Sequence, residues 1–148
     1  MVDNGNERSI TVVPDMASVS QISDFFDSCL EDYAIPLRVG YSVKVVTDEI
    51  FSNIVHYSGA KTAQILFKND ADQITLVFAD DGIPYNPLEA EEPDITAGAE
   101  EREIGGLGLF MVRKMAELVA YDYTGGRNQM TVILSKTAKK RTLILEDF

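Results

Sequence analysis

The sequence is poor in the side chains that form disulfides and bind transition metals. Its 148 residues include one cysteine, one histidine and no tryptophan. One cysteine cannot form an internal disulfide, and one cysteine with one histidine cannot supply most of the four ligands of a structural zinc site. Because Cys29 falls within an apolar helical pattern, we interpret it as a small buried side chain rather than a catalytic thiol.

Basic residues are scarce as well. The chain has 13 lysines and arginines against 24 aspartates and glutamates, which gives a formal net charge of -11. Nucleic acids require a cationic footprint that displaces their counterions, and anionic membrane surfaces attract basic segments. We therefore expect no direct nucleic-acid binding and no membrane binding, and the acidic surplus favours a basic protein partner.

Long apolar runs are also absent. The longest apolar stretches, such as residues 74–79, fall far short of the roughly 20 residues that cross a bilayer. The first residues lack a basic segment followed by an apolar stretch, so no secretory signal is predicted. We expect a cytoplasmic protein with one compact domain, because the length is near the commonest size of a single domain.

Hydrophobic periodicity predicts both helices and strands. Apolar spacings of three and four predict helices over residues 16–33, 37–57 and 106–118, and β-branched alternation predicts strands over 9–13, 62–68, 73–79, 119–123 and 129–135. Residues 82–105 hold prolines and many acidic side chains and are expected to form a long loop. This order predicts an α+β fold, a two-layer sandwich whose mixed, mostly antiparallel sheet is covered on one face by about three helices.

A polar row borders the apolar stripe of the second predicted helix. Glu49, Asn53 and His56 are spaced four and then three residues apart, which predicts that they share one side of the helix. Taken alone, the triplet is more typical of a solvated helix face.

A carboxylate follows the predicted strand over residues 73–79. The alternation of that strand predicts that Asp80 points toward the core, where a charge needs partners. In a ligand site, Asp80 would accept a hydrogen bond from an exocyclic amine, and Gly82 would let a flat ring approach the backbone. The Asp-Asp-Gly sequence is also an ordinary turn signal.

Glycines precede the third predicted helix, in the run Gly105-Gly106-Leu107-Gly108-Leu109. Such a helix start presents backbone N–H groups and a positive dipole end to an anion, so the run is a candidate phosphate cradle. Close backbone packing would equally explain these glycines.

These three elements, in this order, resemble the GHKL superfamily of ATP-binding domains, and more closely its anti-sigma-factor serine kinases with their HATPase-type (Bergerat) fold. Residues 49–53 match the N box of the family, residues 80–87 its first glycine box and residues 101–112 its second. The resemblance covers residues 8–137 and leaves residues 138–148 as a tail. That tail has a basic part followed by an apolar part, and it could dock on a partner or another subunit or be disordered.

The resemblance implies a role for each matching residue. Asn53 would coordinate Mg²⁺ that bridges the ATP phosphates, and Glu49 would act as the general base toward an incoming hydroxyl. Asp80 would hold the adenine amino group, and Gly82 and Pro84 would shape the adenine pocket.

The second glycine box would contact the phosphates of ATP. Residues 88–105 would form a lid, in which Arg102 is a candidate phosphate contact or, alternatively, a surface ion pair with its acidic neighbours. The residues expected along the phosphates are Gly106, Leu107, Gly108 and Leu109.

Two functions follow from the resemblance. The first is an ATP- and Mg²⁺-dependent protein serine/threonine kinase, which binds a sigma factor or similar client and phosphorylates a serine on an anti-sigma-factor antagonist. The alternative is a non-catalytic, nucleotide-switched module that sequesters a regulatory protein. His56 is poorly placed to be the phosphoacceptor of a sensor histidine kinase, and a homodimer is expected by resemblance only.

Overall fold

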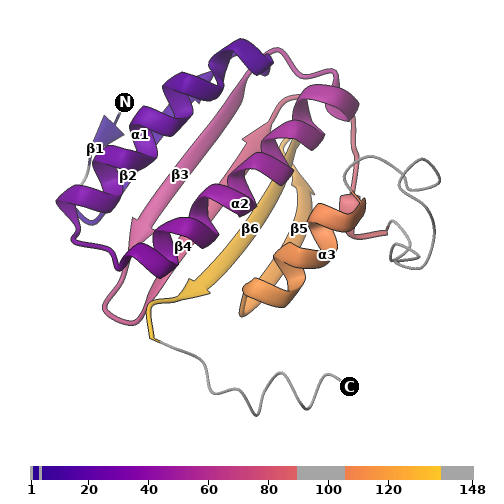
Figure 1. Ribbon diagram of the computed structural model, residues 1–148. Coiled ribbons are helices and arrows are strands. Elements are labelled where there is room, and N and C mark those ends of the chain that lie inside the picture. Colours follow the sequence, from indigo (N-terminus) through magenta and orange to yellow (C-terminus); the bar gives the residue numbers. More distant parts are fainter. Residues whose placement is uncertain (1, 4, 90–105, 138–148) are drawn as a thin grey trace.

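The computed structural model describes residues 2–3, 5–89 and 106–137, and within them a single antiparallel sheet backs a layer of helices (Figure 1). The sheet has six strands in the order β1-β2-β3-β4-β6-β5, and each pair of neighbours is antiparallel. The strands are β1 (Val2–Asp3), β2 (Glu7–Val12), β3 (Ala63–Asn69), β4 (Gln73–Asp80), β5 (Leu118–Thr124) and β6 (Arg127–Ser135).

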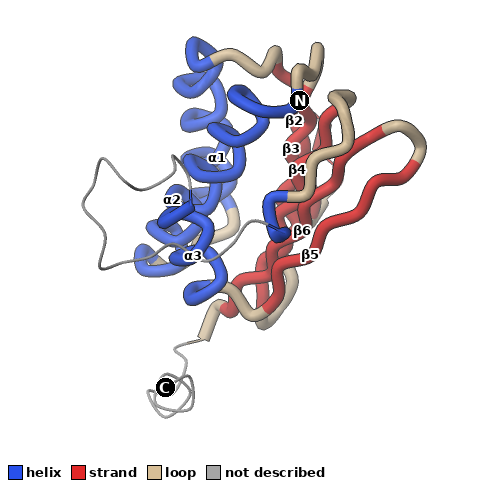
Figure 2. The backbone as a smooth tube through the Cα atoms, turned by 90° about the vertical axis from the view of Figure 1, so that its right-hand side faces the viewer, coloured by secondary structure: helices blue, strands red, loops and turns tan. Residues whose placement is uncertain are grey.

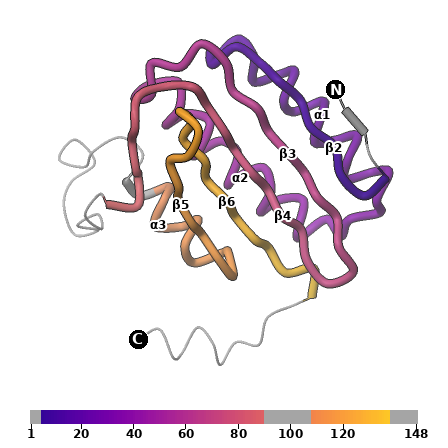
Figure 3. Tube along the Cα trace, turned by 180° about the vertical axis from the view of Figure 1, so that it is seen from behind, coloured from indigo at the N-terminus to yellow at the C-terminus, as the bar shows by residue number. Residues whose placement is uncertain are grey.

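Three α-helices lie side by side on one face of the sheet: α1 (Val19–Asp32), α2 (Leu37–Asn53) and α3 (Gly106–Met115). Figure 2 shows the two layers edge-on, and Figure 3 shows the opposite sheet face without a helix over it. The predicted two-layer α+β fold is confirmed. The predicted tail, residues 138–148, lies outside the described residues.

The core forms between the helices and the inward residues of the strands. Ile65 and Phe67 of β3 alternate inward, as β-strand geometry requires, and both are fully buried. Phe26 of α1 packs edge-on against Phe67, with ring centroids 6.1 Å apart. Cys29 is buried in the same core, which agrees with its interpretation as a small hydrophobic side chain.

All three helices differ from the prediction at an end, and α3 ends at Met115 rather than at residue 118. The first helix is preceded by a 3₁₀ turn, Met16–Ser18, where the carboxylate of Asp15 accepts a 2.7 Å hydrogen bond from the backbone N–H of Ala17. The second helix keeps α geometry only to Asn53 and then widens into a π-helical turn, Ile54–Ser58. Gly59 ends that turn with φ of 64°, in the left-handed region that glycine adopts without strain.

The hairpin between β5 and β6 places β6 between β4 and the edge strand β5. Gly125 and Gly126 form its turn with φ of 63° and 75°, which suits the two positive φ angles of a type I′ turn. Strand β6 therefore pairs with β4 and places Asn128 opposite Asp80. Among the described helices, none is both long and apolar enough to cross a membrane.

Candidate functional site

The last turn of α2 holds two side chains of the predicted polar row. Asn53 Nδ2 donates a 3.2 Å hydrogen bond to Oε2 of Glu49, one helical turn earlier. Asn53 is buried, whereas Glu49 is partly exposed. The spacing of four residues therefore produces the predicted pair.

The third member of the polar row does not join this pair, which corrects the prediction for His56. Its Nδ1 lies 2.8 Å from the carbonyl oxygen of Ser52, and the residue is exposed. The π-helical turn takes more residues per turn than an α-helix, so the residue three positions after Asn53 is no longer aligned with it. His56 is a hydrogen-bonded surface histidine.

Burial of Glu49 has an electrostatic consequence. Desolvation raises the pKa of the Glu49 carboxyl above its ordinary value of 4.5, and the hydrogen bond from Asn53 opposes this shift. A carboxylate with a raised pKa is a better proton acceptor near neutral pH than an ordinary surface glutamate. The Glu49 carboxylate is thus more basic than an ordinary surface glutamate.

Helix α3 packs directly on this carboxylate. A Cβ atom at Gly108 would overlap the carboxylate of Glu49, so glycine is required for the observed approach. Gly106 and Leu107 begin α3, and only their backbone is described. The side chain of Leu109 is buried in the core, which leaves its backbone as the part available to a ligand. The N box and the second glycine box, far apart in sequence, therefore meet at Glu49.

Asp80 ends β4 with only 3% of its surface exposed. Its Oδ1 accepts hydrogen bonds from the backbone N–H of Gly82 at 2.9 Å and from Nδ2 of Asn128 at 3.0 Å. The predicted inward orientation is confirmed. A Cβ at Gly82 would overlap the backbone carbonyl of Ser58, so this glycine permits close contact between two chain segments.

Asn128 links Asp80 to the segment that follows it. Besides bonding Asp80, its Nδ2 donates to the carbonyl of Ile83 at 2.7 Å, and its Oδ1 accepts from the backbone N–H of Tyr85 at 2.9 Å and from the Tyr121 hydroxyl. The sequence interpretation missed this residue. The sequence did contain a signal for it. Asn128 lies two residues before Met130, and alternate residues of a strand share a face, so Asn128 is on the inward face of β6.

A small cavity of about 20 Å³ connects the two halves of the site, and we call it the Asp80 cavity. This volume suits about one water molecule. Both Asn53 and Asp80 line it. The other lining residues are Ile50, Ile54, Ser58, Phe78, Tyr85, Pro87, Tyr121, Asn128 and Met130.

The structure does not place Pro84 or Arg102 in the lining of the Asp80 cavity, for different reasons. Pro84 is exposed, and the lining residues from its segment are Tyr85 and Pro87, both of which the sequence interpretation omitted. Arg102 and most of the predicted lid lie outside the described residues. Asp81 accepts hydrogen bonds from the backbone N–H groups of Lys61 and Thr62, at 2.8 and 3.0 Å, and so holds the loop before β3.

Comparison with known proteins identifies the family. A family model described as histidine kinase-like ATPase domain matches residues 12–136. The chain belongs to this family. The resemblance inferred from the three boxes is confirmed, and an ATP-binding, kinase-type function follows.

Individual members of the family give further comparisons. The serine/threonine-protein kinase BtrW of Bordetella bronchiseptica is 25% identical over 99 residues, which are 64% of this chain and 70% of that protein. The solved structure of the histidine kinase AdeS of Acinetobacter baumannii has a TM-score of 0.51 and 14% identity, over 88% of this chain and 68% of that one. The likeness to AdeS shows that both chains have a histidine kinase-like ATPase fold.

Proposed function

We propose that this histidine kinase-like ATPase domain is a protein serine/threonine kinase of the anti-sigma-factor type. It would bind a sigma factor or similar client and phosphorylate a serine on an antagonist protein. The observation that carries the proposal is the Glu49 carboxylate, which is partly buried, bonded by Asn53 and packed against Gly108. The similarity to a protein named as a serine/threonine kinase supports the same reaction.

The residues present fit ATP with Mg²⁺. The described residues contain no cluster of three or more histidine, cysteine or acidic side chains for a metal, so a cation would rely on Asn53 and on phosphate oxygens. Such sharing of ligands between protein and phosphate is common for Mg²⁺. When bound, ATP supplies the phosphoryl group and Mg²⁺ neutralises charge on its phosphates.

Asn53 would bind the cation, and Glu49 would accept the proton. Asn53 uses its Nδ2 to orient Glu49, which leaves its Oδ1 for the cation. Glu49 would accept the proton of the incoming serine hydroxyl, and its raised pKa brings its basicity closer to neutral pH. The start of α3, beside Glu49, would offer backbone N–H groups to the phosphates.

Adenine recognition would rest on Asp80. Within the described part of the chain, both hydrogen bonds of the Asp80 carboxylate go to Oδ1, so Oδ2 would accept the adenine amino group. The Asp80 cavity holds about one water, so a purine ring would have to displace the segment after Gly82. That segment is held by the bonds to Asn128, by the 2.9 Å bond from the Ile83 N–H to the Ser58 carbonyl, and by the stacking of Tyr85 on Tyr57. Arg113 also donates a 2.7 Å hydrogen bond to the Leu88 carbonyl.

A phosphotransfer assay tests the kinase directly. With γ-labelled ATP and a candidate antagonist, Glu49→Gln should lower transfer to serine by about 10²- to 10⁴-fold, because it removes the general base. The affinity for ATP should be retained, since Glu49 lies away from Asp80, where adenine would bind. Asp48→Asn, which changes the neighbouring exposed carboxylate on α2, is the matched control and should retain transfer.

A nucleotide-switched binding module is the second candidate. The observation that favours it is the need to displace the segment after Gly82, which would alter the surface when nucleotide binds. This function predicts partner affinity that differs between ATP and ADP, no transfer, and no effect of Glu49→Gln. If Mg²⁺-ATP did not shift the thermal unfolding of the protein, both proposed functions would be contradicted, because both require nucleotide binding. Homodimerisation stays a prediction.

A further inference from the structure

A groove of about 370 Å³ runs between α1 and α2, separate from the Asp80 cavity. Its lining is mostly apolar, and among the described residues it shares none with the Asp80 cavity. Its volume falls in the range of sites that hold a ligand or a set of side chains. We call it the α1–α2 groove, and its lining residues are Met16, Val19, Ile22, Ser23, Phe26, Lys44, Thr47, Asp48, Phe51 and Ser52.

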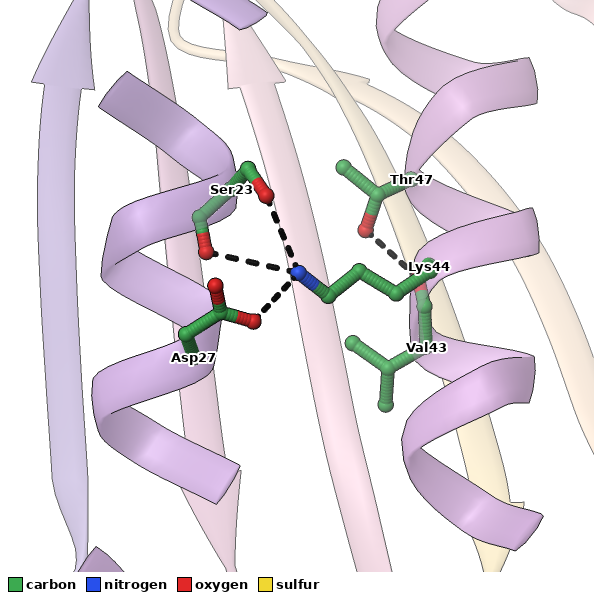
Figure 4. Close-up of polar contacts among 5 residues, drawn as sticks. All are labelled: Ser23, Asp27, Val43, Lys44 and Thr47. Atoms are coloured by element: carbon green, nitrogen blue, oxygen red, sulfur yellow. Dashed lines mark hydrogen bonds and ion pairs between the residues drawn. The ribbon is translucent and has the colours of Figure 1, made fainter. Parts of the chain in front are cut away.

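The single lysine in the lining is already neutralised. Figure 4 shows Lys44 of α2 reaching across to α1, where its Nζ lies 2.6 Å from Oδ1 of Asp27 and 3.1 Å from Oγ of Ser23. It also donates to the Ser23 carbonyl at 3.4 Å. These contacts use the three hydrogens of the ammonium group, so Lys44 braces the two helices and offers no free donor to an anionic ligand.

The surroundings of the groove are acidic. Helix α1 contains four acidic residues and no lysine or arginine. Asp24, Asp27 and Glu31 are exposed at spacings of three and four, so they form a row along α1, in which Asp27 is already paired with Lys44. Asp48 adds a carboxylate from α2. An apolar floor with acidic surroundings suits a segment that carries both cations and apolar side chains.

The tail of this chain has that chemistry. Lys139, Lys140 and Arg141 are followed by three apolar residues at 143–145. The tail leaves the described fold beside α2, because Arg38 in the first turn of α2 donates a 3.0 Å hydrogen bond to the Lys136 carbonyl. The tail therefore starts beside the first turn of α2, and the groove lies farther along the same helix, between Lys44 and Ser52.

The length of the tail matches the distance to the groove. Thr47 lies about 14 Å along α2 from Arg38, at 1.5 Å per helical residue. An extended chain covers roughly 20 Å in the six residues from Thr137 to Leu143, at about 3.3 Å each. The apolar residues can thus reach the groove, while the basic residues pass the acidic row.

An exposed apolar path joins the two points. Tyr41 is 64% exposed and lies on α2 between Arg38 and the groove, and Leu37, which is 92% exposed, lies one turn before it, next to Arg38. An exposed apolar patch that is continuous with a groove is typical of a binding surface.

We propose that residues 138–148 dock along the α1–α2 groove of the same chain. The apolar residues 143–145 enter the groove, and the basic residues 139–141 lie beside Asp24, Asp27 and Glu31. Binding within one chain is favoured over binding between chains because a short tether gives a millimolar effective concentration. The inference does not depend on nucleotide binding or on phosphotransfer.

Disulfide trapping in the full-length chain tests this proposal without nucleotide. Ser23→Cys places a thiol in the groove lining, and Ile144→Cys places its partner in the tail. Cys29 is retained because it is fully buried and inaccessible to exchange. Thr75→Cys with Ile144→Cys is the matched control, since Thr75 pairs with Ile133 near the start of the tail but alternates with core residues and faces away from the helices.

Under mild oxidation, the Ser23 pair should form an intramolecular disulfide roughly tenfold faster than the Thr75 pair, as tethered docking predicts. Replacing Lys139, Lys140 and Arg141 by glutamate should slow the reaction severalfold, and less so at high salt. Equal rates for both pairs would overturn the proposal, as would a disulfide-linked dimer of the Ser23 pair on a non-reducing gel. Circular dichroism of each variant verifies that the fold is retained.

Discussion

Replacing Asn128 by alanine should destabilise this fold far more than an ordinary loss of one hydrogen bond. The amide of Asn128 bonds Asp80, Ile83, Tyr85 and Tyr121, so one substitution removes four partners. Asp80 is the critical one, because its buried carboxylate would retain only the bond from Gly82.

The magnitude follows from the burial of these partners. Loss of the buried partner of Asp80 costs about 2 kcal/mol, and loss at each of the three less buried groups about 1 kcal/mol or less, which gives about 4 kcal/mol in all. Domains of this kind unfold with about 5–15 kcal/mol. At about 2–4 °C per kcal/mol for a chain of this size, the Tm should fall by roughly 10 °C.

Urea unfolding followed by circular dichroism measures the effect. Asn86→Ala is the matched control, because Asn86 is half-buried and its side chain accepts a 2.9 Å hydrogen bond from the Leu88 backbone. We expect the control to cost about 1 kcal/mol. If Asn128→Ala lost no more stability than Asn86→Ala, the assignment of Asn128 as the central hydrogen-bonding residue of the site would be refuted.

Two further predictions concern the glycines and the pH dependence. Gly82→Ala should destabilise the fold by about 1–3 kcal/mol, because its methyl group meets the immobile backbone of Ser58. Gly108→Ala should change stability less, because it meets the end of a side chain, but should lower phosphotransfer by about 10²-fold through displacement of Glu49. Since the folded pKa of Glu49 is raised, its stabilising contribution is complete below pH 4.5 and is lost as pH rises through the folded pKa. Glu49→Gln should therefore gain stability relative to the parent chain as pH increases.

Thermal unfolding and phosphotransfer rates of the two glycine variants give the first comparison, and equal losses of stability for both would contradict it. Urea unfolding of Glu49→Gln and the parent chain between pH 4 and 7 gives the second. A relative gain that grows toward low pH would contradict the assigned direction of the Glu49 shift.

Local periodicity in the sequence predicts much of the geometry of this site. The spacing of four between Glu49 and Asn53 predicts their contact, because residues one turn apart on a helix are neighbours. The alternation of β4 predicts the inward side chain of Asp80 for a similar reason, since successive residues of a strand point to opposite faces. These features depend only on the geometry of single elements.

The contacts that the sequence did not predict join segments that are far apart in the chain. Asn128 lies opposite Asp80 because of the register between β4 and β6, although the two residues are 48 positions apart in the sequence. Gly108 reaches Glu49 through the packing of α3 on α2. Neither contact is encoded in a local spacing. Asn128 was therefore not assigned to the site, and Gly108 was assigned to the phosphates but not to a contact with Glu49.

The sequence by itself determined the α+β layers, the family boxes and the inward side chain of Asp80, because these follow from periodicities of 2 and 3.6 residues and from motif order. Only the tertiary structure decided that His56 leaves the polar row, that Asn128 holds Asp80, and that a groove lies between α1 and α2. Those outcomes depend on the width of one helical turn, the register of one strand pair and the distance between two helices. All three are set by side-chain packing between segments that are distant in the chain.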